Sequence, residues 1–283
     1  MHVQPKPFFL DTPGGQRFCQ LHAATQTVAR GHVVCVHAFA EEMNKSRRMV
    51  ALQARALCAA GFDVLLIDLQ GCGDSAGDFG DATWQGWVDD VMAATAWMAA
   101  RGPTPLWIWG LRAGCLVAVE ASRQMANPCK LVFWAPTPSG KSLLQQFLRL
   151  KAAGDMLGGQ AKTIMDGLRQ QLAEGQAVEV AGYSVSAALA NGLERATLDP
   201  VVHVSGIEWL ELSTRADASL TPVASKTMAQ WQQAGVPVRA RIVSGPSFWQ
   251  TTEIEEAPEL IEATVAALLN PVTQPAAETE VAV

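Results

Sequence analysis

The sequence predicts an α/β fold in which a mostly parallel sheet carries helices on both faces. Short apolar segments alternate with amphipathic helical segments along most of the chain, which is typical of parallel strands connected by helices. Nearly continuous apolar runs indicate strands that are buried on both faces. Six such runs lie at residues 33–37, 64–68, 106–109, 131–135, 207–212 and 238–243.

Helical periodicity is clearest at residues 84–95 and 260–268, and Pro258 stands at a suitable first helical position before the second of these segments. Two N-terminal segments, 8–10 and 17–21, are separated by a Pro-Gly-Gly turn. We expect them to pair as an antiparallel edge. With the six apolar runs they make an eight-stranded sheet.

The alternation stops between residues 137 and 205, where no strand is evident and apolar residues recur at helical spacing. We therefore expect a helical cap at 137–205, inserted into a core formed by 1–136 and 206–269. Insertions at the carboxyl end of such a sheet tend to cover a ligand crevice. Residues 270–283 are polar, contain proline and lack periodicity, so we expect a disordered tail.

Composition excludes several classes of function. The net charge of −6 and the lack of a long basic run argue against nucleic-acid binding. No apolar stretch of about 18 residues predicts a membrane span, and the N-terminus does not resemble a signal peptide, so a cytoplasmic location is expected. The six cysteines are scattered without a Cys-x-x-Cys spacing and are expected to be free thiols. Nothing indicates a metal site or a cofactor.

Three segments after predicted strands resemble motifs of the α/β-hydrolase superfamily. His-Ala-Phe at 37–39 resembles the oxyanion loop, and Asp-Leu-Gln-Gly-Cys-Gly-Asp-Ser at 68–75 resembles the D-x-R-G-x-G-x-S loop. Gly-Leu-Arg-Ala-Gly at 110–114 resembles the G-x-S-x-G nucleophile elbow, with Arg112 in place of the serine. The resemblance implies the α/β-hydrolase fold over almost the whole chain.

The standard Ser–acid–His triad does not fit this sequence. In this fold the serine precedes the acid, and the acid precedes the histidine. Asp217, in the segment after the seventh strand, is the candidate acid, but all five histidines precede it and the last is His203. Arg112 cannot replace the serine because a guanidinium stays protonated and has no lone pair for attack on a carbonyl.

A narrower resemblance lies in residues 34–47, 71–75 and 109–115. These segments are similar to the bacterial family of exosortase A system-associated hydrolases, second type. That family is linked to machinery that anchors proteins with a PEP-CTERM signal and to exopolysaccharide production. The resemblance implies a hydrolase, with exosortase-system proteins as candidate partners.

Two roles are open for Arg112. Above a helix start it can grip a carboxylate or a phosphate of a ligand bidentately. Alternatively it pairs internally with Glu41, Glu42 or Asp217 and closes the pocket. The groups within hydrogen-bond reach of its guanidinium decide between these two roles.

Other residues near the elbow are further candidates. The backbone N–H of Ala113, with that of Phe39 or Ala40, is expected to form an oxyanion hole. Glu42 and Asn44 are candidate ligand contacts because they follow the oxyanion loop.

Alternative nucleophiles are Cys115, on the first turn of the next helix, and Cys72 or Ser75 in the neighbouring loop, with His37 as their base. The structural alternative for each is packing, a turn or a loop brace. Ser46 is expected to cap the following helix.

Two functions follow as hypotheses. The first is an esterase, thioesterase or acyl-transfer enzyme with a non-standard site formed by Arg112, Cys115 and Asp217. The second is a non-catalytic accessory protein that holds a small molecule, anionic or acyl, or binds a protein partner through the degenerate pocket.

Overall fold

The computed structural model describes residues 4–154 and 161–273 of the chain. Its central sheet has eight strands in the order β1-β2-β4-β3-β5-β6-β9-β10. The pairs β1–β2 and β2–β4 are antiparallel, and the other neighbours run parallel. The strands are β1 (Lys6–Thr12), β2 (Gly15–His22), β3 (Gly31–Val36), β4 (Phe62–Ile67), β5 (Leu106–Leu111), β6 (Cys129–Trp134), β9 (Val204–Ser213) and β10 (Val238–Ser244). The predicted α/β-hydrolase fold class is confirmed.

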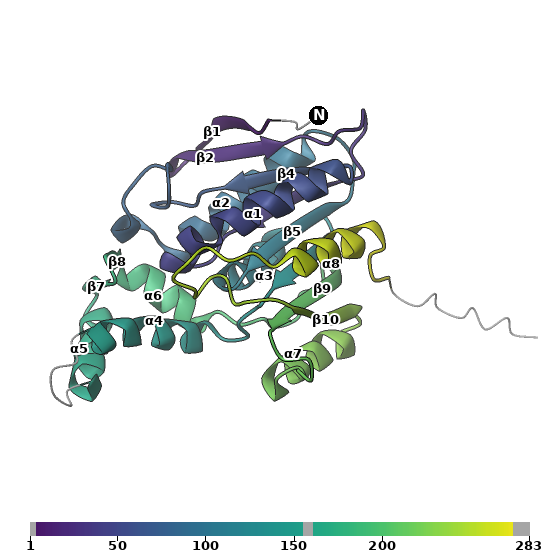
Figure 1. The fold of residues 1–283 in the computed structure, drawn as a ribbon. Coiled ribbons are helices and arrows are strands. Elements are labelled where there is room, and N and C mark those ends of the chain that lie inside the picture. Colours follow the sequence, from purple (N-terminus) through teal and green to yellow (C-terminus); the bar gives the residue numbers. More distant parts are fainter. Residues whose placement is uncertain (1–3, 155–160, 274–283) are drawn as a thin grey trace, which may run out of the picture.

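Helices cover both faces of the sheet (Figure 1). α1 (Glu41–Ala59) and α8 (Pro258–Leu269) pack on one face. α2 (Trp84–Ala99), α3 (Ala113–Gln124) and α7 (Pro222–Gln233) pack on the other. Because both faces are covered, the parallel strands β3 and β4 are buried along their whole length.

The segment between β6 and β9 forms the cap, which lies at one end of the sheet (Figure 1). It contains α4 (Gly140–Gly154), α5 (Ala161–Ala173) and α6 (Ala187–Arg195). The expectation that it holds no strand is wrong, because β7 (Val178–Val180) and β8 (Tyr183–Val185) form a hairpin within it. Each strand has three residues, which is too short to show an alternating pattern in the sequence.

The start of α1 differs from the prediction. Ser46 lies inside the helix, where its hydroxyl donates a hydrogen bond of 2.6 Å to the Glu42 carbonyl, and it is not a cap. The helix begins six residues earlier than a cap at Ser46 implies, after Ala40, whose backbone takes φ 51° and ψ −124°. This strained turn aims the first turn of α1 toward the cap end of the sheet.

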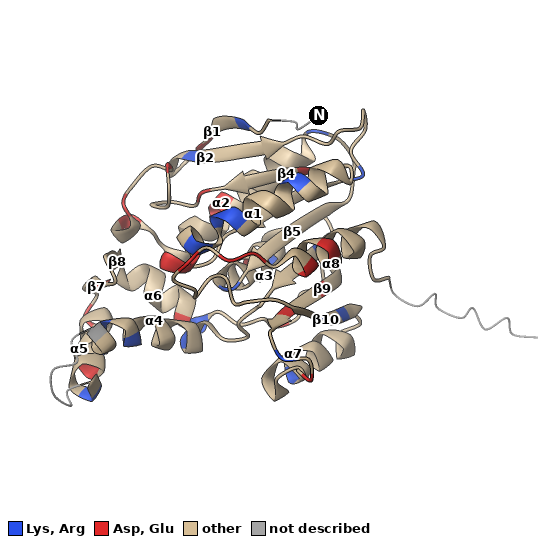
Figure 2. Cartoon of the chain, in the orientation of Figure 1, with Lys and Arg blue, Asp and Glu red and all other residues tan. Residues whose placement is uncertain are grey.

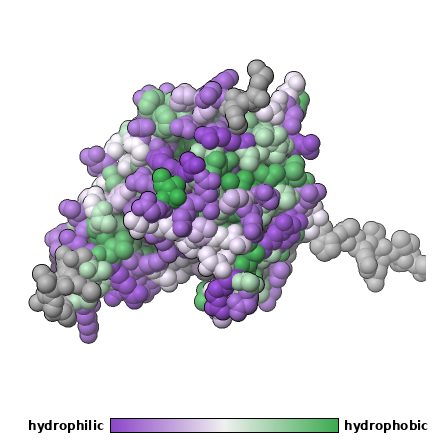
Figure 3. Space-filling view, in the orientation of Figure 1, coloured by the Kyte–Doolittle hydropathy of each residue, from purple (hydrophilic) through white to green (hydrophobic). Residues whose placement is uncertain are grey.

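Among the residues that the structure describes, no helix is long and apolar enough to cross a membrane. On the face seen in Figure 3, hydrophobic residues form several separate areas between hydrophilic ones. Most of the predicted tail, residues 274–283, lies outside the described residues.

Candidate functional site at the elbow between β5 and α3

Arg112 occupies the sharp turn between β5 and α3 with a left-handed backbone, φ 55° and ψ −115°. A side-chain-bearing residue in this region of φ/ψ space costs about 1–3 kcal/mol and persists only where the surroundings impose it. The backbone N–H of Arg112 donates to the Trp134 carbonyl at 3.0 Å, which ties the turn to β6.

Two glycines make this turn sterically possible. A Cβ atom on Gly114 would lie 2.2 Å from the Val36 carbonyl oxygen, and a Cβ atom on Gly110 would lie 2.6 Å from the Cys115 Cα. Both distances are far inside van der Waals contact. The elbow glycines are therefore required by the packing of α3 against β3 and β5, whatever the side chain at position 112 does.

The Arg112 guanidinium pairs with Glu42, in the first turn of α1. Its Nε donates to both carboxylate oxygens at 3.3 Å, and its Nη2 donates to Oε1 at 3.3 Å. A further contact of 3.4 Å joins Nη1 to the Ala135 carbonyl. The two side chains are only 12% and 11% exposed, so the ion pair is largely shielded from water. Of the two roles open for Arg112, the geometry favours the internal pair.

The sequence did not single out two further residues that interact with the guanidinium, Trp249 through a ring contact and Glu211 through its charge. The ring of Trp249, in the loop after β10, lies 5.4 Å from the guanidinium carbon of Arg112. Glu211, on β9, accepts a hydrogen bond of 2.8 Å from the Trp209 indole. Burial raises the pKa of the Glu211 carboxyl, and the charge of Arg112 acts in the opposite direction.

Burial also dominates the electrostatics of Glu42. Its pKa is raised above the ordinary carboxyl value by desolvation, although the charge and hydrogen bonds of Arg112 lower it. The neighbouring Glu41 carboxylate raises it further. Arg112 therefore pairs directly with Glu42 from α1, and its charge also acts on the half-buried Glu211 from β9.

Asp217, the candidate triad acid, makes its ion pair within its own loop. Asp217 is 77% exposed and accepts hydrogen bonds of 3.3 and 3.2 Å from Arg215, two residues away. The structure does not bring it to the elbow guanidinium. The loop after β10 contains Phe248 and Trp249, both buried, and no histidine.

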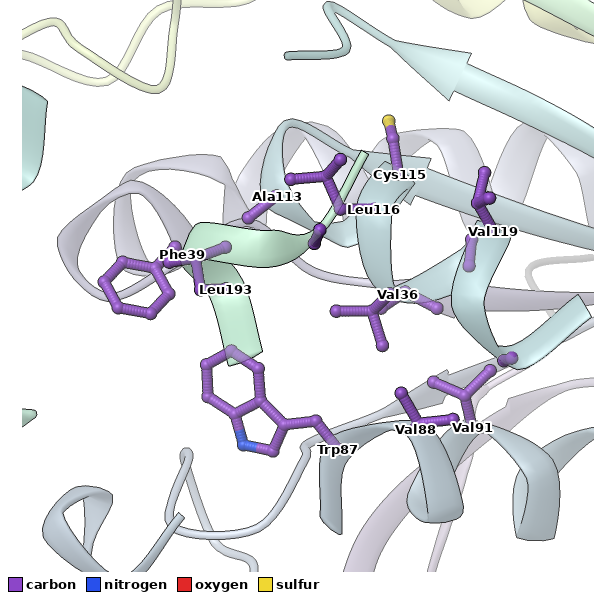
Figure 4. Packing of buried hydrophobic residues seen from close by; sticks show 14 of the residues in the cluster. Val36, Phe39, Trp87, Val88, Val91, Ala113, Cys115, Leu116, Val119 and Leu193 are labelled. Atoms are coloured by element: carbon purple, nitrogen blue, oxygen red, sulfur yellow. The ribbon is translucent and has the colours of Figure 1, made fainter. Parts of the chain in front are cut away.

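Cys115 does not have the environment of a nucleophile. It is fully buried, and its thiol donates to the Gly110 carbonyl at 3.2 Å. Burial raises its pKa well above the ordinary thiol value. Figure 4 shows its sulfur pointing away from Phe39. Since the thiolate is the reactive form, this position favours packing.

Hydrogen bonds hold the loop after β4, and its candidate residues take part in them or are buried. The Ser75 hydroxyl donates to the Asp68 carbonyl and accepts from the Phe18 N–H at 2.9 Å. Desolvation raises the pKa of Cys72 to about 12. His37 faces Asp68, with Nε2 4.0 Å from Oδ1, and burial lowers its pKa to about 4. These contacts match the structural alternatives for these residues.

The candidate backbone donors of the oxyanion hole lie at helix starts. Ala113 is the first residue of α3, so the Ala113 N–H has no acceptor within the helix, and Arg112 supplies no side-chain cap. Ala40 precedes α1 with dihedral angles close to those of Arg112, again without a side-chain cap. Phe147, from α4 in the cap, packs edge-to-face on the neighbouring Phe39, with ring centroids 5.0 Å apart.

A cavity of about 280 Å³ lies beside the ion pair. Its walls come from α4, the start of α1 and the loop after β10. The lining residues are Phe39, Glu41, Glu42, Lys45, Leu143, Gln146, Phe147, Leu150, Trp249 and Gln250. Glu42 and Trp249, which hold Arg112, belong to this wall, whereas Arg112 is not one of its lining residues in the described chain.

Asn44, a candidate ligand contact, is not among the residues that line this cavity in the described chain. Its side-chain amide donates to the Tyr183 hydroxyl at 2.9 Å and so links α1 to the β7–β8 hairpin. Over the residues described, no cluster of three or more His, Cys, Asp or Glu side chains is arranged to hold a metal ion.

The sheet order, the strained elbow and the cap define a protein of the α/β-hydrolase superfamily. Within it, the chain belongs to the family described as serine aminopeptidase, S33, whose model matches residues 27–173. Protein ABHD12B from Homo sapiens is 35% identical over 92 residues, which are 32% of this chain and 24% of that protein. The chain therefore matches only about a quarter of the length of that relative.

Solved structures show the same fold at low identity. Est1E from Butyrivibrio proteoclasticus, with ferulic acid bound, superimposes with a TM-score of 0.63 at 15% identity over 92% of this chain and 96% of its own. A thermostable carboxyl esterase from Bacillus coagulans gives 0.60 at 13% identity, over 94% and 98%. A soluble variant of monoglyceride lipase from Saccharomyces cerevisiae gives 0.58 at 12% identity, over 94% of both chains.

Proposed function

We propose that this chain is a ligand-binding member of the α/β-hydrolase superfamily that holds a small, partly apolar molecule in the cavity beside α4 and does not use serine chemistry. The observation that carries the proposal is the shielded Arg112–Glu42 pair at the position of the nucleophile. A guanidinium cannot attack a carbonyl carbon.

The same pair argues against the anionic ligand that Arg112 alone suggests. An entering anion would have to displace Glu42 from the guanidinium. Glu42 would then be a largely buried carboxylate without its counter-charge, which is strongly unfavourable. The ligand is therefore expected to bind on the cavity side of Glu42 and Trp249 and to leave the pair intact.

The cavity has the character of a small-molecule site. Its volume is near the lower end of the roughly 300–1,000 Å³ usual for ligand pockets. Its walls combine aromatic and aliphatic side chains, such as Phe147 and Leu143, with a few polar groups, as is typical of such sites.

Two matched variants test the proposal. Leu150 lines the cavity and is 42% exposed, and Leu269, at the end of α8, is 41% exposed. With 1-octanol as the probe and calorimetry as the measurement, wild type and Leu269→Trp are expected to bind, whereas Leu150→Trp fills the site and loses binding. Equal binding by all three proteins would contradict the proposal.

We further propose that the protein acts with the exosortase and PEP-CTERM exopolysaccharide system, because of the resemblance in residues 34–47, 71–75 and 109–115. Deletion of the gene in a host that carries this system is expected to reduce surface-anchored PEP-CTERM proteins or exopolysaccharide. Unchanged amounts of both would contradict the association.

A second candidate function is an ester, thioester or acyl-transfer hydrolase with a non-standard site. The observation that favours it is the uncapped N-terminus of α3, where the Ala113 N–H can stabilise an oxyanion. Purified protein is tested on p-nitrophenyl and thioester acyl substrates. Activity that survives in the triple variant Arg112→Ala, Cys115→Ala, Asp217→Asn excludes these side chains as its source.

A further inference from the structure

We infer that the cavity beside α4 takes a ligand with a cationic amine head group joined to a short apolar chain. The inference rests on the ligand-binding function proposed above and names the chemical class of the ligand. It starts from Glu41, a wall residue that the elbow does not use.

Glu41 is a half-buried carboxylate in the first turn of α1. Its Oε2 is buried and has no hydrogen-bond donor within the described chain. Glu42, next to it, is already engaged by Arg112. Figure 2 shows this acidic start of α1 at the end of the sheet where the cap lies.

A partly desolvated carboxylate is a favourable partner for a cation. The protein partly shields Glu41 from water, and burial raises its pKa, although a hydrogen bond from its own backbone N–H and the charge of Lys45 act in the opposite direction. A ligand that brings an N–H donor and a positive charge offsets the free-energy cost of shielding the carboxylate from water, because charges attract more strongly where water is excluded. The terminal torsion of a Glu side chain is broad, so either oxygen can turn to the ligand.

The positive groups nearby do not make the cavity a better site for anions. Lys45, one helical turn after Glu41, lines the same wall, and its charge lowers the pKa of the Glu41 carboxyl, but its side chain is exposed to solvent. An anion at Lys45 would lie near both Glu41 and Glu42. The positive end of the α1 dipole acts against a cation, but these two first-turn carboxylates already offset it.

The aromatic walls suit an ammonium with an apolar tail. The rings of Phe39 and Phe147 lie 5.0 Å apart in an edge-to-face arrangement, and Trp249 forms another part of the wall. Aromatic faces attract ammonium groups electrostatically. Leu143 and Leu150, on α4, offer aliphatic surface for the chain that follows.

The test uses three compounds with the same chain and different head groups: octylamine, 1-octanol and octanoate. Calorimetry at neutral pH is expected to show octylamine binding at least about tenfold more tightly than the other two, a difference of about 1.4 kcal/mol. Glu41→Gln is expected to remove this preference, so that the variant binds octylamine no more tightly than 1-octanol. Glu262→Gln, an exposed change on α8, is the control and is expected to keep the preference.

The outcomes separate this inference from the proposed function. If 1-octanol binds in a manner that Leu150→Trp abolishes, but octanoate equals or exceeds octylamine, the amine inference is overturned and the ligand site stands. A preference for octylamine that survives in Glu41→Gln also overturns it. If none of the three compounds binds, the proposed function and the inference both fall.

Discussion

The elbow after β5 and the loops after β9 and β10 lie at the same edge of the sheet, but they retain different parts of the α/β-hydrolase design. At the elbow, the strained backbone is intact and only the side chain at position 112 departs from the motif. In the loops, Asp217 faces solvent, and the segment after β10 contains Trp249 and no histidine.

The difference teaches that an intact elbow is weak evidence for catalysis. Its shape is imposed by close packing, since Gly114 lies against the Val36 carbonyl and admits no side chain. The Arg215–Asp217 segment, by contrast, is largely exposed to solvent. The fold can therefore preserve the turn for structural reasons, whatever chemistry the residues of the neighbouring loops support.

The largest expected effect is on the free energy of unfolding, and it differs between the ion pairs of these two regions. Arg112→Met leaves Glu42 largely buried without a counter-charge, so the free energy of unfolding in urea is expected to fall by about 3 kcal/mol. Arg112→Met combined with Glu42→Met is expected to recover most of this loss, because an apolar pair can replace a buried ion pair.

The matched control is Arg215→Met, in the loop after β9, where both partners are about three-quarters exposed. Its expected cost is below about 1 kcal/mol, as for other surface ion pairs. Similar losses in Arg112→Met and Arg215→Met, or no recovery in the double variant, would break the contrast between the regions.

The next effect is the pH dependence of the stability that Glu42 contributes at the elbow. The raised pKa of Glu42 means that its carboxyl binds protons more readily in the folded than in the unfolded protein. The resulting stability is complete below the ordinary carboxyl pKa of 4.5 and is lost as the pH rises through the raised value. The loss is about 1.4 kcal/mol per unit of difference between the two pKa values.

Glu42→Gln lacks this ionisation. The stability of wild type relative to Glu42→Gln is therefore expected to decline between pH 4 and neutral pH in urea titrations. A relative stability that rises over this range would show that Arg112, and not burial, determines the direction of the pKa shift of Glu42.

Much of the fold could be predicted from the sequence, because strands such as β3 and β4 are buried on both faces and read as continuous apolar runs. The β7–β8 hairpin could not, since its strands are too short to establish a period. The start of α1 was misplaced to Ser46 because the left-handed backbone of Ala40 replaces the usual polar cap.

The candidate site was predictable only in part. The sequence named Glu42 among three candidate partners for Arg112, but it could not choose between Glu41 and Glu42. Their different partners depend on the rotation of α1 about its axis. Glu211 lies within an apolar run that predicts a strand. A charged residue in such a run was the one feature of the sequence that could have indicated its role.

A smaller effect concerns the thiols. All six cysteines are buried, and desolvation raises the pKa of Cys19, Cys72 and Cys129 to about 12. In the native protein, fewer than one thiol per chain is expected to react with Ellman's reagent within minutes at neutral pH, and all six after unfolding. Rapid native labelling of Cys115, located by peptide mass spectrometry, would restore it as a nucleophile.

The most direct test is the turnover of p-nitrophenyl butyrate by Arg112→Ser beside wild type. Serine at the elbow restores the nucleophile motif, but the loops after β9 and β10 still offer an exposed Asp217 and no histidine. The expected result is no increase in kcat/KM over wild type. An increase of about tenfold or more would show that a working base lies at this site and would contradict the account.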